Sequence, residues 1–207
     1  FSFVYFYERR VRRILPALFF VMLTCIPFAW MWMVPGQMKD FSQSIVAVSL
    51  FVSNLLFWKE SGYFDASAEE KPLLHTWSLA VEEQYYVFFP IFLFLTWRFG
   101  KTRVFWIIVV MASISLILSE WGWRNKVTAN FYFALTRAWE IFAGSIAAFV
   151  VQKKGVQKSE ITSLLGLLAI IFAFIFYDEK TPFPSIYSLV PVVGVVLLIM
   201  FGDKETL

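Results

Sequence analysis

The chain has 207 residues, of which 59% are hydrophobic and only 16% are charged, and its net charge is +3 at neutral pH. A soluble domain has roughly a quarter charged residues and about half apolar residues, so this composition argues against a soluble protein and indicates lipid as the solvent. The chain has one cysteine, Cys25, and one histidine, His75, which excludes an internal disulfide and a zinc site built from these residue types.

Apolar runs close to the length that a helix needs to cross a bilayer, roughly 20 residues, recur along the whole chain. Backbone polar groups in lipid must pair within their own segment, so each run is predicted to be a helix. The predicted fold class is all-α: a polytopic transmembrane helical bundle of about six to seven apolar helices. In chain order, the predicted helices cover residues 14–34, 41–58, 79–97, 104–118, 129–151, 161–177 and 186–201.

Two of these runs carry features that modify the prediction. In the first run, Pro16 is expected in the first turn and Pro27 is expected to kink the helix. The run 41–58 is the weakest, because it contains four serines, Gln43 and Asn54. It is predicted either to span the bilayer or to be re-entrant or buried.

Three basic segments set the expected orientation, since short cytoplasmic loops are rich in Lys and Arg. They lie at residues 9–13, 98–103 and 153–158. Seven strictly alternating spans would place the second and third segments opposite the first, against this rule. If 41–58 does not span, all three lie inside, and the segment 59–71, with Glu60, Asp65, Glu69 and Glu70, lies outside. Both topologies stay open.

The first basic segment holds four arginines in five residues, Arg9, Arg10, Arg12 and Arg13. One interpretation is a topology signal whose side chains snorkel to lipid phosphates. The other is a site for an anionic cosubstrate, because guanidinium forks match phosphate groups.

Several polar side chains fall on one stripe of the helix predicted next, at 100° per residue. The stripe comprises His75, Ser78, Glu82, Tyr86 and Phe89, whereas Glu83 points away from it. A carboxylate near an imidazole orients it and raises its basicity. Ionisable groups at membrane depth are costly and mark function, although His75 is also interpretable as an interfacial hydrogen-bonding group and Glu82 as a helix-packing contact.

Arg137 and Glu140 lie three residues apart inside another apolar run, so they are expected to meet on one helix face. They are interpreted either as a structural ion pair or as a substrate contact. Gly144 is expected to permit close helix approach. The sequence shows no cluster of metal ligands and no glycine-rich phosphate loop. The basic runs border apolar spans, so no nucleic-acid partner is expected.

Three motifs stand in order along the chain: FYERRVRRILP at 6–16, PLLHTWSLAVEEQYY at 72–86 and TRAWEIFAG at 136–144. With these motifs the chain resembles the acyltransferase 3 family, bacterial membrane O-acyltransferases that acetylate lipopolysaccharide O-antigen, peptidoglycan and other envelope sugars. Residues 1–207 are interpreted as a partial membrane domain, an internal fragment whose first spans and C-terminal part are missing. The leading catalytic histidine of the family belongs to the missing first span, and its role is not transferred to His75.

The resemblance implies acyl transfer, mainly of acetyl, from a thioester donor to a hydroxyl of an envelope glycan or lipid-linked sugar, in a multi-pass protein of the bacterial inner membrane. Acetyl-CoA or a similar donor is expected as a cosubstrate, with no bound cofactor. Residues 61–72, SGYFDASAEEKP, also resemble members with a further SGNH-hydrolase-like domain. The fragment alone is expected to be inactive.

By motif, the resemblance assigns an active-site or channel role to four residues: His75, Ser78, Glu82 and Glu83. It assigns a donor-side role to Arg9, Arg10, Arg12 and Arg13, and a structural or substrate-path role to Arg137 and Glu140. The alternative function is a transporter or a lipid or glycan flippase with an intramembrane Glu/Arg path. A structural or sensor protein with buried ion pairs is a third possibility. The string HTWSLAVEEQYY and the lack of an inverted repeat favour the acyltransferase.

Overall fold

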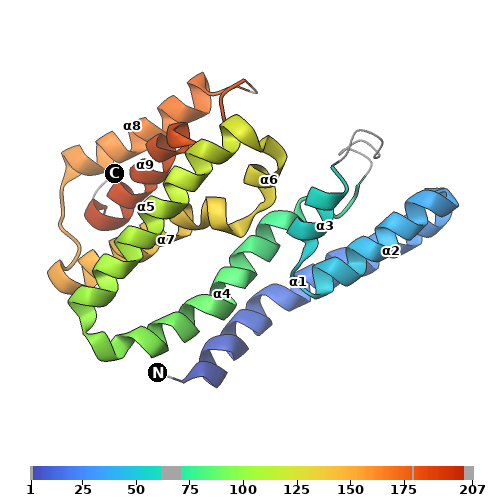
Figure 1. Cartoon of the computed structure of the whole chain (residues 1–207), viewed down its shortest axis with the longest axis horizontal. Helices are drawn as coiled ribbons and strands as arrows, with labels where there is room; N and C mark the ends of the chain where they lie inside the picture. Colours follow the sequence, from blue (N-terminus) through green and yellow to red (C-terminus); the bar gives the residue numbers. More distant parts are fainter. Residues whose placement is uncertain (1, 62–70, 179, 203–207) are drawn as a thin grey trace. The chain divides into compact units, whose positions relative to one another are not determined.

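The computed structural model describes residues 2–61, 71–178 and 180–202, and every regular element in these ranges is helical. The chain divides into two compact units, Phe1–Phe92 and Leu93–Leu207, which we describe separately. Figure 1 shows the helices, which are α1 (Phe3–Trp32), α2 (Pro35–Ser49), α3 (Ser53–Lys59), α4 (Thr76–Thr96), η2 (Trp97–Phe99), α5 (Lys101–Asn125), α6 (Val127–Tyr132), α7 (Ala134–Lys154), α8 (Glu160–Phe176), η3 (Ile186–Ser188) and α9 (Leu189–Phe201).

The predicted all-α membrane bundle is confirmed. In the described part of the chain, four helical segments are long and apolar enough to cross a bilayer: Phe3–Trp32, Thr76–Phe99, Lys101–Asn125 and Val127–Lys154. Two further helices, Glu160–Phe176 and Ile186–Phe201, are apolar but shorter. These four long and two shorter segments make six apolar helices in the described residues, within the predicted range of six to seven.

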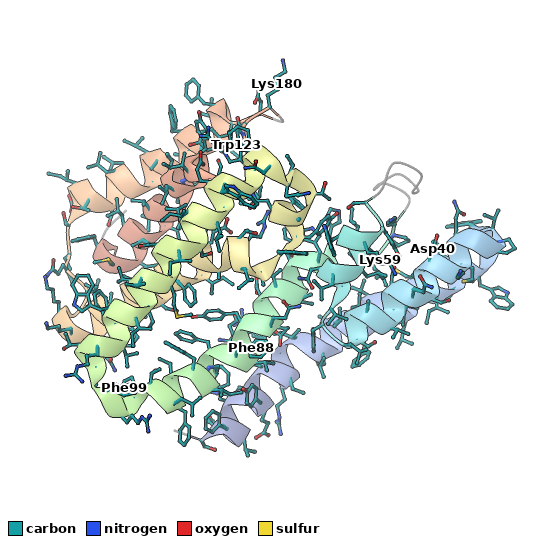
Figure 2. All side chains as sticks on the ribbon, in the orientation of Figure 1. Asp40, Lys59, Phe88, Phe99, Trp123 and Lys180 are labelled. Atoms are coloured by element: carbon teal, nitrogen blue, oxygen red, sulfur yellow. The ribbon has the colours of Figure 1, made fainter. Side chains whose placement is uncertain are left out.

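The surface has the character expected of a protein in lipid. Large apolar side chains project from the helices (Figure 2), and Trp30 is 79% exposed, Phe94 68% and Phe174 89%. Ser53 and Ser119, in contrast, are fully buried. Apolar surface on this scale is a liability in water, whereas lipid tails solvate it.

Helix α1 begins at Phe3, eleven residues earlier than predicted from the apolar run. Arginine is a good helix former, so the basic segment continues the helix instead of preceding it. Ser2 caps this end by accepting a hydrogen bond from the Tyr5 amide at 3.4 Å. The prediction that Pro16 lies in the first turn is therefore wrong, since it lies in the helix interior with Pro27. The arginine side chains thus occupy defined faces of a helix.

The run 41–58 is not one helix, because the chain breaks between α2 and α3 at residues 50–52. Phe51 has a φ of 55°, in the left-handed region that non-glycine residues rarely adopt. The 15 residues of α2 and the seven of α3 are each too few to cross a bilayer alone. The break releases backbone carbonyls that other side chains must satisfy.

The predicted helix 129–151 is also broken, at Phe133, which has extended backbone angles between α6 and α7. The carbonyls released there are satisfied locally. The Thr136 hydroxyl donates to the Asn130 and Phe133 carbonyls at 2.7 and 3.0 Å, and the Arg137 Nε donates to the Phe131 carbonyl at 2.7 Å. The preceding helix does not end near Glu120, as predicted, but continues to Asn125 as α5.

Helices α5 and α7 of the second unit run antiparallel. Lys101, the first residue of α5, and Lys153, near the end of α7, line one pocket, so these two ends lie together. The two basic segments 98–103 and 153–158 therefore lie at the same end of this unit, which both predicted topologies require, so the choice between them stays open.

Helices α8 and α9 pack with their backbones in close contact at two glycines. A Cβ atom at Gly166 would lie 2.7 Å from the Gly194 carbonyl oxygen, and a Cβ at Gly194 would lie 2.7 Å from the Gly166 carbonyl oxygen. The close approach predicted at Gly144 is not found within the second unit, because a Cβ placed there would meet no described atom within 4 Å apart from the adjacent backbone of α7. The sequence analysis expected a glycine to permit close helix packing, and the structure shows this packing between α8 and α9.

We expect Gly194→Ala to lower the melting temperature of the detergent-solubilised protein, because its methyl group would collide with backbone that cannot rotate away. Overpacking of this kind costs roughly 1–3 kcal/mol. Gly144→Ala is the matched control, and should be neutral or slightly stabilising, since alanine is the better helix former. Equal melting temperatures for the two variants in thermal unfolding would contradict the packing described here.

Candidate active site

Polar side chains gather at two places among the apolar helices, one in each unit. The first lies where Arg10 of α1 contacts Tyr86 of α4, with Glu83 within electrostatic range of Arg10. These three residues are here called the α1–α4 junction. The second is the pair of Arg137 and Glu140 on α7, here called the α7 pair. The residues around each determine what chemistry it can perform.

The α1–α4 junction is built on a cation–π contact. The Arg10 guanidinium lies 3.9 Å from the centroid of the Tyr86 ring and 5.6 Å from that of Phe6. One turn earlier on α1, the Tyr7 hydroxyl donates a hydrogen bond to the Val87 carbonyl at 3.0 Å. Helix α1 therefore runs antiparallel to α4, with Arg10 against the middle of it.

Glu83 is the buried carboxylate of this junction. It is 9% exposed and lies within electrostatic range of Arg10. Its Oε1 atom is buried and accepts no hydrogen bond from the residues that the structure describes. A buried polar atom left in this state costs stability, so it calls for an explanation beyond packing. Such a carboxylate beside a guanidinium is a candidate for chemistry.

The orientation of Glu83 depends on hydrogen bonds between α4 and the α2–α3 break. Gln84 Nε2 donates to the Asn54 Oδ1 at 2.9 Å and to the Phe51 carbonyl at 3.0 Å. The Ser53 hydroxyl donates to the Thr76 carbonyl at 3.0 Å. Sequence reasoning missed this support, although the signal was present in the polar residues of the weak run 41–58. Together these bonds fix the rotation of α4 about its axis.

The predicted stripe begins one residue too early, because α4 starts at Thr76 and His75 lies in the preceding turn. His75, Ser78 and Glu82 are all exposed, and the Ser78 hydroxyl donates to the His75 carbonyl at 3.2 Å. No hydrogen bond in the described part of the chain joins the imidazole to Glu82. The predicted pairing of imidazole and carboxylate is therefore absent here, and the catalytic roles of these residues stay predictions.

The four arginines of α1 separate into two groups. Arg10 is half-buried against α4, whereas Arg9, Arg12 and Arg13 are exposed. Arg9 lies 4.5 Å from the centroid of the Tyr5 ring, and Arg12 forms an ion pair with Glu8 at 2.7 Å. Of these four arginines, Arg10 is the one that interacts electrostatically with the buried Glu83 carboxylate.

The α7 pair meets on one helix face, as predicted. Arg137 Nη1 lies 3.7 Å from Glu140 Oε2, and the Arg137 side chain is 8% exposed. Its guanidinium also lies 4.9 and 4.6 Å from the ring centroids of Phe131 and Phe183. Arg137 therefore ties α6, α7 and the loop before η3 together, which favours a structural role for Arg137. Glu140 Oε1, like Glu83 Oε1, is buried and accepts no hydrogen bond from the described residues, so both interpretations of the pair stay open.

The acidic segment expected outside is only partly described. Glu60 and Lys71 form an ion pair at 3.0 Å with both side chains largely buried, which closes the ends of this segment. Asp65, Glu69 and Glu70, and most of the motif at 61–72, lie outside the described residues.

Comparison with known proteins gives the same family as the motifs. The sequence matches the family model described as "Acyltransferase domain" over residues 1–205. It is 31% identical over 188 residues to an "Uncharacterized protein" of Haemophilus influenzae, covering 84% of this chain and 75% of that protein. It is 28% identical over 193 residues to "Peptidoglycan O-acetyltransferase OatA" of Listeria monocytogenes, covering 86% of this chain and 31% of that protein.

A third relative is the "Putative membrane-bound transacylase BcsY" of Komagataeibacter xylinus, 28% identical over 204 residues that cover 98% of this chain and 52% of that protein. The chain thus spans about a third of the Listeria protein and about half of the Komagataeibacter protein. No solved structure matches the chain significantly. The family match over nearly the whole length shows that this chain belongs to the acyltransferase 3 family.

Proposed function

We propose that this chain is part of a membrane O-acyltransferase that transfers an acyl group, mainly acetyl, to a hydroxyl of a cell-envelope glycan. The observation that carries the proposal is the buried Glu83 carboxylate beside Arg10 in the α1–α4 junction. Family membership and the printed names of the Listeria and Komagataeibacter relatives support it. The protein then resides in the bacterial inner membrane, with peptidoglycan, O-antigen or a lipid-linked sugar as acceptor.

The reaction requires three tasks of the protein. The acceptor hydroxyl must lose a proton as its oxygen attacks the thioester carbonyl, and the oxyanion that forms needs a nearby positive charge or donor. The carbon–sulfur bond then breaks, and the thiolate that leaves takes up a proton. A thioester such as acetyl-CoA also carries phosphates that need cationic partners.

The junction residues match these tasks. In this proposal the Glu83 carboxylate accepts the proton of the acceptor hydroxyl and later returns it to the leaving sulfur. The Arg10 fork binds an anionic group of the donor or the developing oxyanion, and the Tyr86 ring holds the guanidinium plane in place. Glu82, His75 and Ser78 lie on the exposed side of α4 and of the turn before it, and remain candidates for acceptor contacts.

The two adjacent glutamates provide an internal comparison. We expect Glu83→Gln in the full-length enzyme to reduce O-acetylation of the envelope glycan at least tenfold, because the amide keeps the volume but cannot take the proton. Glu82→Gln should lower it less, since that side chain is exposed. The measurement is base-released acetate per glycan from a deletion strain complemented with each variant, at matched protein levels. Normal acetylation by Glu83→Gln would remove the carboxylate from the mechanism.

The role of Tyr86 can be separated from that of its hydroxyl. Tyr86→Phe keeps the ring that contacts Arg10 and should retain most activity, whereas Tyr86→Leu removes the cation–π contact, worth roughly 0.5–2 kcal/mol. With Leu we expect a several-fold higher donor concentration for half-maximal transfer by membranes containing the full-length protein. If Phe and Leu behave alike at equal protein levels, Tyr86 does not position Arg10 for the donor.

A further inference from the structure

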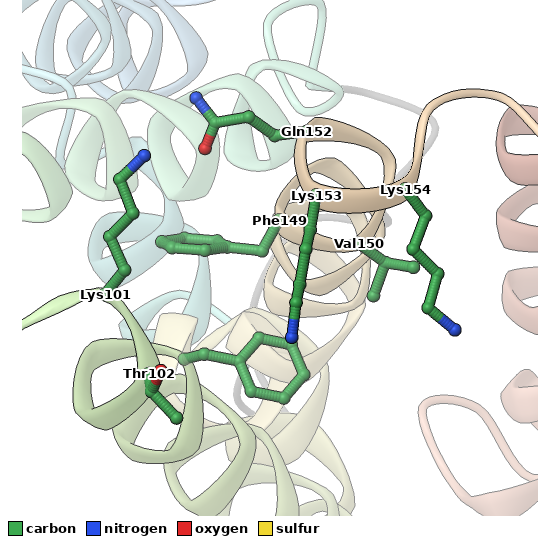
Figure 3. Close-up of a pocket in the computed structure, with 8 residues that line it drawn as sticks. Lys101, Thr102, Phe149, Val150, Gln152, Lys153 and Lys154 are labelled. Carbon is green, nitrogen blue, oxygen red and sulfur yellow. The ribbon is translucent and has the colours of Figure 1, made fainter.

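A second basic site lies within the second unit and is built from residues that the proposed acyl transfer does not use. A pocket of about 460 Å³ opens between the first turn of α5 and the last turns of α7, a volume typical of small-ligand sites. Figure 3 shows the Phe149 side chain extending from α7 toward the side of Lys101, and the Lys154 side chain extending to the opposite side of α7. The lining residues are Lys101, Thr102, Phe105, Phe149, Val150, Gln152, Lys153 and Lys154.

The pocket combines positive charge with an aromatic wall. Three of its lining residues are lysines, and none is acidic. Phe105 and Phe149 are half-buried and meet edge to face, with ring centroids 6.2 Å apart. The Thr102 side chain adds a hydroxyl at the rim. This lining fits a ligand with an anionic head and an apolar or planar body.

Helix electrostatics explain only part of the lysine cluster. Lys153 and Lys154 lie in the last turn of α7, where a positive charge is favourable to the helix dipole. Lys101 is the first residue of α5, where the dipole is also positive and a cation is unfavourable. The cation–π contact of Lys101 with Trp97, at 5.8 Å, offsets this only in part. Both Lys101 and Lys153 line one pocket, and placing two cations there is favourable when an anion binds in it.

The anion is best identified as a phosphate. Lysine binds phosphate as a compact point charge through three donors. The N-terminal turn of α5 contributes further to the positive potential of the pocket. The pocket is flanked by the basic segments 98–103 and 153–158, and basic segments of this kind usually face the cytoplasm. Soluble phosphorylated metabolites and anionic lipid headgroups are both present there.

We propose that this pocket binds a phosphate-bearing ligand through Lys101 and Lys153, with its apolar or planar part against Phe105 and Phe149. The phosphate belongs either to an anionic lipid headgroup or to a soluble nucleotide-like molecule. Nothing in the acyl-transfer mechanism uses these residues, so the site stands independently of the proposed function.

The two sources are distinguished by two binding measurements on the full-length protein in nanodiscs. In phosphatidylcholine nanodiscs, ADP is titrated by calorimetry, with adenosine as the phosphate-free comparison. In the second arm, native mass spectrometry counts phosphatidylglycerol retained by the protein from mixed phosphatidylglycerol and phosphatidylcholine. Preference for ADP over adenosine assigns a soluble phosphate, and retention of phosphatidylglycerol assigns a headgroup.

In whichever arm binding appears, Lys101→Gln and Lys153→Gln should each weaken it at least fivefold. Lys158→Gln is the matched control, since it removes one exposed positive charge near the same end of α7 without touching the pocket, and it should change binding less than twofold. The proposal is overturned if neither arm shows preference for the anionic phosphate, or if Lys158→Gln weakens binding as much as the pocket variants do. Neither result bears on acyl transfer, which is measured separately.

Discussion

The structure depends on one constraint: in lipid, a backbone carbonyl released from a helix must find a partner within the protein. Two of the predicted helices are broken within the described residues, at Phe51 and at Phe133, and a polar side chain donates to a carbonyl near each break. Gln84 donates to the Phe51 carbonyl, and Arg137 donates to the Phe131 carbonyl. Gln84 belongs to α4 and reaches the break between α2 and α3, and Arg137 belongs to α7 and reaches α6, so these bonds join segments that apolar packing alone would leave free to rotate.

The same constraint links stability to the candidate site. Gln84 is the neighbour of Glu83 on α4, and its two hydrogen bonds fix which face of α4 meets Arg10 and which faces outward. A helix interior made only of apolar residues would slide or turn at little cost, because lipid tails solvate Leu and Phe as well as a neighbouring helix does. The hydrogen bonds of Gln84 would be lost if α4 turned or slid, so they hold the charged residues in register.

The sequence predicted the helical membrane fold well and the site less well. Long apolar runs such as 161–177 correspond to helices within a few residues, because lipid imposes length and internal hydrogen bonding. Breaks inside a run leave no trace in hydropathy, so 41–58 and 129–151 were read as continuous. The family motif marked both Glu82 and Glu83, but helical spacing from His75 favoured Glu82. The rotation of α4 that places Glu83 depends on the hydrogen bond from Gln84 to Asn54, two residues 30 positions apart, and helical periodicity carries no information on such a contact.

The position of the α1–α4 junction along its helix has a consequence for how a group could move through the protein. Glu83 is seven residues from the first residue of α4, and Tyr86 is ten residues from the last. At 1.5 Å per residue these steps are about 10 and 15 Å along α4, whereas Arg10 is seven residues, again about 10 Å, from the first residue of α1. The junction therefore lies near the middle of α4 but close to the arginine-rich end of α1. In the proposed reaction, an anionic donor would reach Arg10 from the arginine-rich end of α1 without entering most of the hydrocarbon layer. Neither reactant would have to traverse the whole bilayer.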